Sequence, residues 1–137
     1  MTKYKEVEDL LENYSNLEVD IKGIECLIKA EGLKGIFYDD MPKSPNINTS
    51  SPVEGTLYKL DRLRNDKLRL EIKKESMDNM FKLLTRLEYD IMKLKYIEGL
   101  SKSKIARELD IHENTVSKRH KDILEKCNSY CIRYKLI

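Results

Sequence analysis

The sequence predicts an all-α protein in which two long helices, forming a hairpin or a coiled-coil arm, precede a C-terminal helix-turn-helix domain. Three observations support this fold class. Apolar residues recur every three or four positions over two long stretches, which is the spacing of a helix with one buried face. Only five glycines and three prolines interrupt 137 residues. Capping residues then mark the starts of shorter helices near the C-terminus.

The first predicted helix spans residues 1–36. Its apolar seam covers four heptads and consists of Val7, Leu10, Tyr14, Leu17, Ile21, Ile24 and Ile28. Gly32 and Gly35 are typical of a helix end, so we expect residues 36–38 to form a short extended or docking segment. Residues 37–51 collect prolines, Asn and Ser without periodicity, which predicts a loop.

The second predicted helix spans residues 52–84. Ser51, Pro52 and Glu54 supply its cap, its first-turn proline and its capping acid, and the apolar seam repeats at Leu63, Leu70, Met77 and Leu84. Lys67 and Lys74 interrupt the neighbouring seam position, where a lysine is tolerated if its ammonium reaches water. The two seams can pair within one chain or between chains, and we expect a homo-oligomer through residues 1–84.

The predicted helix-turn-helix domain spans residues 85–137. Thr85 and Glu88 form a T-x-x-E capping box, which predicts a helix from about Arg86 to Ile97. Either a break or a kink at Thr85 fits this pattern. Gly99 is suited to a left-handed helix end, and Ser101 can cap the next short helix, which runs to Leu109.

A tight turn and a final helix complete this domain. Ala106 is small enough to sit where two helices cross closely, and Asp110 occupies the turn, because Asp tolerates unusual backbone angles. Ile105, Leu109, Ile111 and Val116 can fill the small core. The last helix starts near Glu113 and carries exposed polar and basic side chains, a shape that suits the DNA major groove.

Three short motifs recur at fixed spacing in this region: Tyr96-Ile97-Glu98-Gly99-Leu100-Ser101, Ile105-Ala106 and Thr115-Val116. With them, Leu84 to Leu124 resembles the fourth region of bacterial sigma factors. Two positions depart from the family pattern: Thr85 replaces the usual proline, and Lys104 replaces the usual acid before Ile-Ala. A second segment, Tyr38-Asp39-Asp40-Met41-Pro42 followed by Ser51-Pro52-Val53-Glu54, is similar to what precedes such a motif in phage late-transcription regulators of the ArpU type. The resemblance implies a phage or prophage activator that binds double-stranded DNA and contacts RNA polymerase.

The charge distribution supports a DNA-facing C-terminal part. The net charge is only +2, but residues 85–137 hold 12 basic and 8 acidic side chains. If Val116 faces the core, the candidates for reading bases are His112, Glu113, Asn114, Thr115, Ser117, Lys118 and Lys121. The candidates for binding backbone phosphates are Ser101, Lys102, Lys104 and Arg119. These side chains predict a sequence-specific transcription regulator.

Other classes of protein are not expected. No apolar run is long enough for a membrane span, and three cysteines without a C-x-x-C motif fit reduced thiols, so we expect a cytoplasmic protein. His120, Cys127 and Cys131 share a helical face, but one continuous helix cannot close a tetrahedral zinc site. No nucleophile and base pair or phosphate loop can be assembled, which predicts neither an enzyme nor a cofactor.

Two alternatives to a regulator stay open. A phage small terminase subunit also joins a helix-turn-helix to an oligomerising helical region, and it binds packaging-site DNA. A helical protein-interaction adaptor, on which the basic helix is only a solvated face, is the other.

Overall fold

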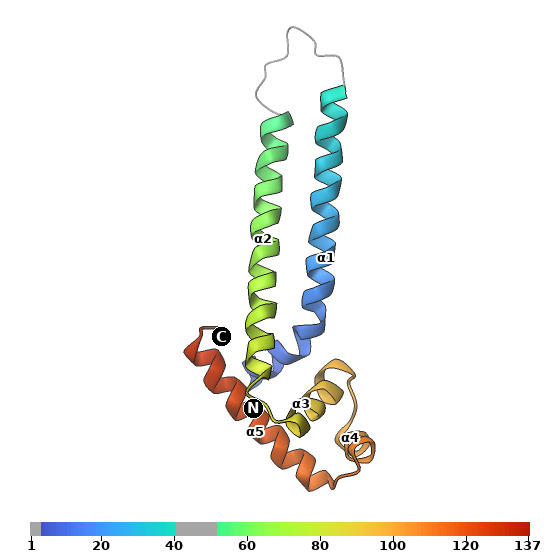
Figure 1. Ribbon diagram of the computed structural model, residues 1–137, viewed down its shortest axis with the longest axis vertical. Helices are drawn as coiled ribbons and strands as arrows, with labels where there is room; N and C mark the ends of the chain where they lie inside the picture. The colour runs from blue at the N-terminus through green and yellow to red at the C-terminus, as the bar shows by residue number, and fades with distance from the viewer. Residues whose placement is uncertain (1–3, 41–51) are drawn as a thin grey trace. The chain divides into compact units, whose positions relative to one another are not determined.

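The computed structural model describes residues 4–40 and 52–137. The described residues form α1 (Lys5–Asp40), α2 (Pro52–Phe81), α3 (Arg86–Met92), the π-helix η1 (Lys93–Ile97), α4 (Lys102–Leu109) and α5 (Glu113–Arg133) (Figure 1). They contain no strand, so the predicted all-α class, with two long helices first, is confirmed. The chain divides into two compact units. Unit 1 is Met1–Asn16 with Lys73–Ile137, and unit 2 is Leu17–Ile72.

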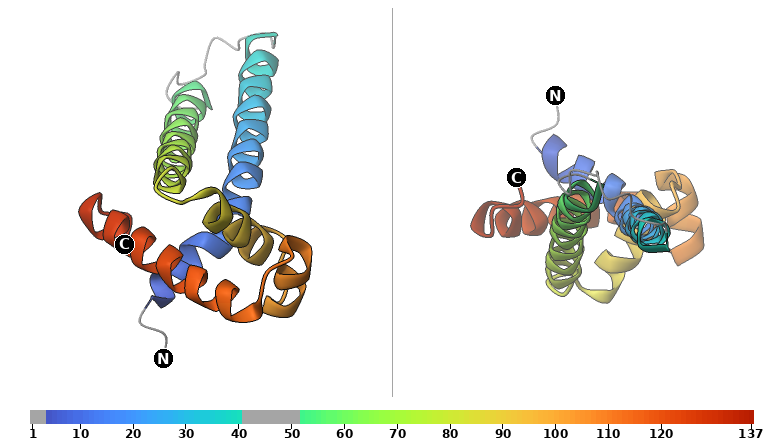
Figure 2. Two further views of the ribbon diagram at one scale, coloured as in Figure 1. Left: turned by 60° about the horizontal axis from the view of Figure 1, so that its bottom comes forward. Right: turned by 90° about the horizontal axis from the view of Figure 1, so that it is seen from above.

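Unit 2 is a pair of antiparallel helices from one chain. The parts of α1 and α2 in this unit lie side by side in both Figure 1 and Figure 2. Leu17 and Leu60 are buried, whereas Ile21, Ile24 and Ile28 are only half-buried. The Lys67 ammonium lies 3.3 Å from the Glu25 carboxylate across the pair and 3.8 Å from Glu71. The seams therefore pair within the chain, and Lys67 keeps its ammonium at the edge as expected.

The ends of the two long helices differ from the predicted ends. The expectation of an extended segment at residues 36–38 is wrong, because α1 continues through Gly32 and Gly35 to Asp40. Glycine inside a helix costs roughly 1 kcal/mol relative to alanine, which a long helix can tolerate. The rest of the predicted loop, residues 41–51, and with it the predicted cap Ser51, lies outside the described residues.

The second helix ends three residues before the predicted position 84. The amides of residues 82–84 donate to carbonyls three residues earlier, at 3.0 to 3.1 Å, so the chain tightens into turns after Phe81. Thr85 is then extended, with φ −68° and ψ 166°. An N-cap needs this non-helical conformation to turn its side chain onto the next helix, so the capping box itself breaks the helix at Thr85.

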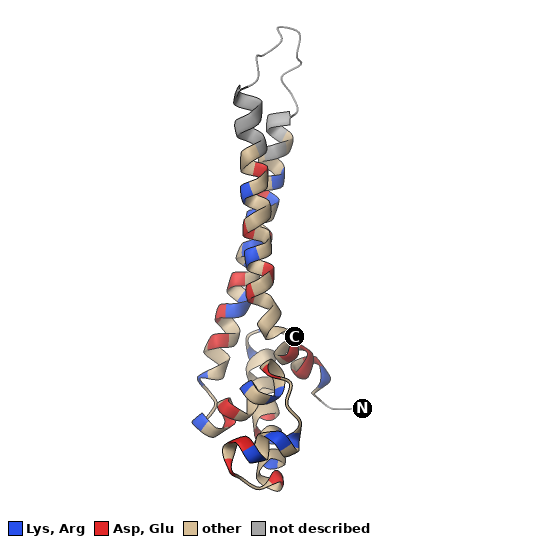
Figure 3. Cartoon of the chain, turned by 90° about the vertical axis from the view of Figure 1, so that its right-hand side faces the viewer, with Lys and Arg blue, Asp and Glu red and all other residues tan. Residues whose placement is uncertain are grey.

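Unit 1 encloses a sealed core built from five helices. The first turns of α1 and the end of α2 pack with α3, α4 and α5, and Tyr14 stacks edge-on to Phe81 with ring centroids 5.0 Å apart. The fully buried apolar side chains are Val7, Leu11, Met77, Met80, Ile91, Met92, Ile105 and Ile123, with Cys127 and Cys131. Charged residues of both signs are spread over the outside of the C-terminal helices (Figure 3). Within the described residues, no helix is long and apolar enough to cross a membrane.

Candidate nucleic-acid interface

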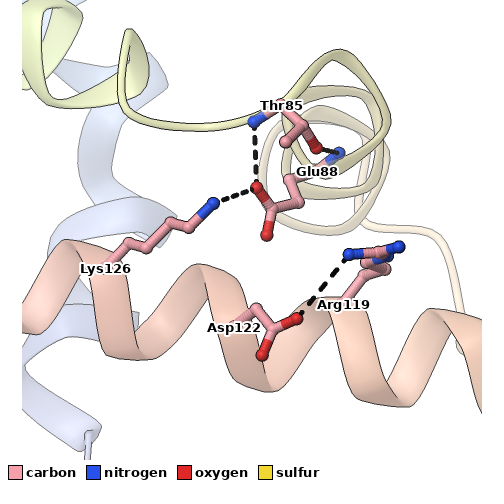
Figure 4. Close-up of polar contacts among 5 residues, drawn as sticks. All are labelled: Thr85, Glu88, Arg119, Asp122 and Lys126. Atoms are coloured by element: carbon pink, nitrogen blue, oxygen red, sulfur yellow. Dashed lines mark hydrogen bonds and ion pairs between the residues drawn. The ribbon is translucent and has the colours of Figure 1, made fainter.

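The first helix of the predicted domain is held at its start by a capping box. The Thr85 amide donates to Glu88 Oε1 at 2.9 Å, and the Glu88 amide donates to Thr85 Oγ1 at 3.2 Å, as predicted. The same Glu88 oxygen lies 2.6 Å from Lys126 Nζ, which reaches across from α5 (Figure 4). Glu88 is 1% exposed and Lys126 is 40% exposed. This pair joins α3 to α5.

The charge of Glu88 is stabilised in the folded state. Burial alone raises the pKa of this carboxyl, but the hydrogen bonds from Lys126 and Thr85 outweigh it and hold the pKa below its ordinary value. The carboxylate therefore stays ionised and keeps both partners near neutral pH. Sequence reasoning found the cap but not Lys126, because its partner lies 38 residues away in the chain.

A π-turn and a left-handed glycine separate α3 from α4. The chain widens to π-helical bonding over η1, where the Glu98 amide donates to the Lys93 carbonyl at 3.1 Å. Gly99 has φ +69°, a conformation that suits glycine, as predicted. Ser101 is the N-cap of α4, since its Oγ accepts from the Lys104 amide at 3.4 Å.

The turn between α4 and α5 is built on an aspartate. Asp110 is left-handed, with φ 54° and ψ 49°, and the Ile111 amide closes the turn on the Ala106 carbonyl at 2.9 Å. Ala106 is 7% exposed, and Val116 on α5 is 3% exposed. The predicted tight turn and close helix crossing are therefore present, with Asp110 in the backbone role that glycine often fills.

The start of α5 is fixed by two side chains predicted to read bases. His112 is the N-cap, and its Nδ1 accepts from the Asn114 amide at 3.1 Å. The Ser103 hydroxyl donates to the Glu113 carboxylate at 2.7 Å, which joins α4 to α5. Both side chains are exposed, but part of their hydrogen-bonding capacity is used within the protein. Thr115 is half-buried.

The remaining predicted base readers form one exposed row. Asn114, Ser117, Lys118 and Lys121 are all exposed and follow the i, i+3, i+4, i+7 spacing of a single helical face. Within the part of the chain that the structure describes, these four side chains make no hydrogen bond or ion pair. Their donors and acceptors are thus free for a ligand, on a helix whose opposite face is buried.

The predicted phosphate contacts lie on two helices. Ser101, Lys102 and Lys104 are exposed at the start of α4. Arg119 lies on α5 with its guanidinium 3.8 Å from the Asp122 carboxylate, and both side chains are nearly half exposed (Figure 4). Such an exposed pair is weak and can exchange for a phosphate.

Behind the exposed row, a partly buried polar network connects α5 to α1 and η1. His120 Nε2 lies 2.5 Å from the Tyr96 hydroxyl, which donates to Glu8 Oε1 at 3.3 Å. Because Tyr96 has one proton to donate, an Nε2–H tautomer of His120 satisfies both bonds. Burial, followed by the charge of Lys95, lowers the pKa of His120 against the opposing effect of Glu8. Nothing in the sequence near Glu8 indicated that this residue would join the network.

The two C-terminal cysteines are core residues. Cys127 and Cys131 are fully buried, and Cys131 Sγ lies 3.7 Å from Met80 Sδ. Burial raises the pKa of Cys127 to about 12 and also raises that of Cys131. The thiols are therefore protonated and pack as small apolar groups. The described residues contain no group of three His, Cys, Asp or Glu side chains that could hold a metal ion.

Comparisons with known proteins give one result. No curated protein and no solved structure matches the chain significantly. One family profile, described as a protein of unknown function (DUF722), matches residues 3–129. This match covers both long helices and nearly all of the helix-turn-helix region, so the chain belongs to the DUF722 family.

Proposed function

We propose that this protein is a sequence-specific DNA-binding transcription regulator that reads the major groove with the first half of α5. The observation that carries the proposal is the exposed row Asn114, Ser117, Lys118 and Lys121, which has no partner among the described residues. An α-helix fits the major groove, where Asn can pair with adenine and Lys can donate to guanine. A row of unpaired polar side chains on one helical face fits direct readout of bases better than it fits the role of an ordinary solvated surface.

Other contacts in unit 1 hold α5, and with it the exposed row, in position. Glu88 with Lys126 and Ser103 with Glu113 fix α5 against α3 and α4, and the His112 cap fixes the first turn of α5 itself. A reading helix held on rigid contacts loses little entropy when it enters the groove. His112 and Glu113 then serve mainly to position α5, while still facing the groove edge.

Backbone phosphates are bound from both sides of the row. Lys102 and Lys104 approach from α4, and Arg119 approaches from α5 after leaving Asp122. These contacts set register and affinity without specifying sequence. The proposal includes RNA polymerase as a partner, in keeping with the sigma-like resemblance, and a cytoplasmic location, where the thiols stay reduced.

Selection from a random double-stranded DNA library, followed by fluorescence anisotropy on the enriched sequence, tests the proposal. Asn114→Ala with Lys118→Ala should weaken binding to that sequence by at least about tenfold, because each lost base contact removes roughly 1–3 kcal/mol of discrimination. Lys102→Ala with Lys104→Ala should weaken binding to all sequences and flatten the salt dependence by about one unit per lysine. Ser129→Ala, an exposed site further along α5, is the control and should change neither.

Two results would overturn this function. One is the absence of salt-sensitive binding to any double-stranded DNA, which would favour a protein-interaction adaptor. The other is specific binding without any effect on transcription from a promoter beside the selected sequence, which would favour a DNA-packaging role. Far-UV circular dichroism of each variant shows that the helices are intact.

A further inference from the structure

Unit 2 carries a second apolar stripe on the outer face of α1. Val19, Gly23, Cys26, Ala30 and Leu33 are spaced alternately by four and three residues, and all are exposed, Val19 by 67% and Leu33 by 54%. Each seam residue that faces α2 is offset from this stripe by about two positions, or roughly 200° around the helix. The stripe therefore lies on the side of α1 that α2 does not cover.

The outer face of α2 carries a matching set of larger side chains. Tyr58, Leu68 and Ile72 are 70%, 54% and 56% exposed, and Asn65 lies between them in the same row. Ile72 is two positions beyond the seam residue Leu70, so this row also faces away from the intramolecular seam. Unit 2 thus has an outer edge whose middle is made of small residues and another outer edge with large apolar residues.

We infer that these two edges bind each other in neighbouring copies of the chain, with the outer face of α1 packed antiparallel on the outer face of α2 of the next copy. The Glu25–Lys67 pair sets the register inside one hairpin. The same register between copies places Gly23 beside Leu68. Because Gly23 has no side chain, it leaves a hole on α1 that the Leu68 side chain of the next copy can fill.

The ends of the two edges match in the same way. This register brings Val19 against Ile72 and Leu33 against Tyr58, so four exposed apolar side chains of unit 2 cover one another. Burial of such side chains is the main driving force for helix association in water.

Charges beside the stripe agree with this pairing. In the same register Asp20 lies near Arg69 of the next copy, and Lys22 lies near Glu71. Lys29 and Arg64 of the next copy carry like charges, and the nearby Asp61 carboxylate, 3.8 Å from the Arg64 guanidinium, offsets their repulsion. Opposite charges that flank an apolar seam specify partner and orientation.

The alternative of two α1 helices packed together is less favourable. It would set the small residues against each other, and in the antiparallel orientation it would bring Lys22 of one copy beside Lys29 of the other. It would also leave Leu68 and Ile72 exposed. The contact between α1 and α2 of separate copies buries both edges instead.

This contact is heterologous, so it does not end at a dimer. Each copy presents one small-residue edge and one large-residue edge, and repetition of the contact generates a ring or an open chain. The stripe from residue 19 to 33 is only about 22 Å long, at 1.5 Å per residue. A contact of this length is at the low end of interface size, so we expect reversible assembly that increases with protein concentration.

Disulfide crosslinking tests the contact directly. The register puts Cys26 opposite Asn65 of the next copy, whereas inside one chain the two positions face away from each other. Mild oxidation of Asn65→Cys should therefore give a ladder of linked dimers and larger species. Cys127 and Cys131 are fully buried and should not react. Asn65→Cys combined with Cys26→Ser should remain unlinked.

A matched pair of charge substitutions tests the same contact without crosslinks. Ile72→Lys should raise the dissociation constant for assembly at least tenfold, measured by analytical ultracentrifugation. Ile132→Lys in unit 1 alters an isoleucine that is 64% exposed, close to the 56% of Ile72, and should leave assembly unchanged.

Either of two outcomes overturns the inference. The wild-type chain sediments as a 16.2 kDa monomer at every concentration tested, or it links through Cys26 alone as readily as Asn65→Cys does, which would show that two α1 helices meet. Since the contact lies in unit 2, its failure would leave the proposed DNA reading by α5 untouched.

Discussion

Unit 1 and unit 2 use similar helical spacing but reach different degrees of burial. In unit 1, Ile91, Ile105 and Ile123 are each 0% exposed. In unit 2, the seam residues Ile21, Ile24 and Ile28 remain half-buried although they follow the heptad spacing. Two helices can cover only one side of each other, whereas helices that approach from several directions enclose a core. Heptad spacing therefore predicts that helices pair, but not that they form a sealed core.

The contacts of Glu88 in unit 1 are also less exposed than those of Lys67 in unit 2. Glu88 in unit 1 is 1% exposed and holds partners from two segments. Lys67 in unit 2 is 30% exposed, and its partners Glu25 and Glu71 are 42% and 49% exposed. Polar contacts that are shielded from water contribute more to stability, so the same substitution should have a larger effect in unit 1 than in unit 2.

The largest expected contrast is between two isoleucines. Ile105→Ala should lower the free energy of unfolding by about 3 kcal/mol, because it leaves a cavity in a closed core. Ile24→Ala should cost about 1 kcal/mol, since water already reaches this side chain. Urea unfolding followed by circular dichroism measures the first, and native-state hydrogen exchange of the unit 2 amides measures the second. Equal losses would show that unit 2 is as well packed as unit 1.

The next contrast separates the capping box from the ion pair at Glu88. Glu88→Ala removes both and should cost about 2–3 kcal/mol, whereas Glu88→Gln keeps an acceptor for the Thr85 amide and should cost about 1 kcal/mol. The partly exposed Lys126 limits the contribution of the charge. Thermal unfolding of Glu88→Gln, of Lys126→Met and of the variant that combines them gives the coupling energy between Glu88 and Lys126. If Gln cost as much as Ala, the charge and not the cap would be the main contribution.

The same residue predicts the acid dependence of stability. Because the pKa of Glu88 is lower in the folded chain than its ordinary value of 4.5, its contribution is complete above pH 4.5. It is lost as the pH falls through the lower, folded value. Glu88→Gln should flatten this part of the stability curve. A mutant curve parallel to that of the wild type between pH 5 and the folded pKa would contradict the assignment.

These contacts show where sequence reasoning succeeded and where it could not. Local chemistry predicted the Thr85 capping box, the left-handed Gly99, the Ser101 cap and the start of α5 at Glu113, because each depends on residues within one turn. Lys126 was out of reach, since nothing near it in sequence marks a partner 38 residues away.

Two further features depend on competition between weak local preferences. Gly32 and Gly35 fit a helix end or a tolerated interior equally well, and the structure has both inside α1. His112 was expected among the base readers, and its role as the N-cap of α5 is set by the turn at Asp110. A histidine is not among the usual capping residues, so composition alone did not indicate it.

A smaller effect is expected at the Tyr96 network. Tyr96→Phe removes the hydroxyl between His120 and Glu8 and should lower stability by about 1 kcal/mol at pH 7. Tyr89→Phe, which alters a tyrosine that is 39% exposed, is the control and should change little. The folded pKa of His120 is depressed, so the contribution from its neutral form is present above its unfolded value and is lost as the pH falls through the folded one. Titration of the His120 ring protons by NMR measures this pKa directly.

The smallest effects should differ in sign between the two units. In unit 2, Lys67→Met keeps the aliphatic stem in the seam and removes a charge from a half-buried position, which should stabilise the hairpin by less than about 1 kcal/mol. In unit 1, Lys74 lies 3.2 Å from Asp78, which also accepts from the Tyr14 hydroxyl, and its ammonium is 5.9 Å from the centre of the Tyr14 ring. Lys74→Met should therefore destabilise by less than about 1 kcal/mol, because the pair with Asp78 is partly exposed.

Hydrogen exchange resolved by residue distinguishes these two lysine variants, because the protection of each unit is measured separately. If both substitutions stabilised the chain, the polar contacts of unit 1 would contribute no more than those of unit 2. If both destabilised it, the Glu25–Lys67 pair would be needed to hold the hairpin in register despite its exposure. Opposite signs would show that a lysine at a seam position is stabilising where its carboxylate partner also accepts from a tyrosine hydroxyl, as Asp78 does, and not where it meets partly exposed carboxylates alone.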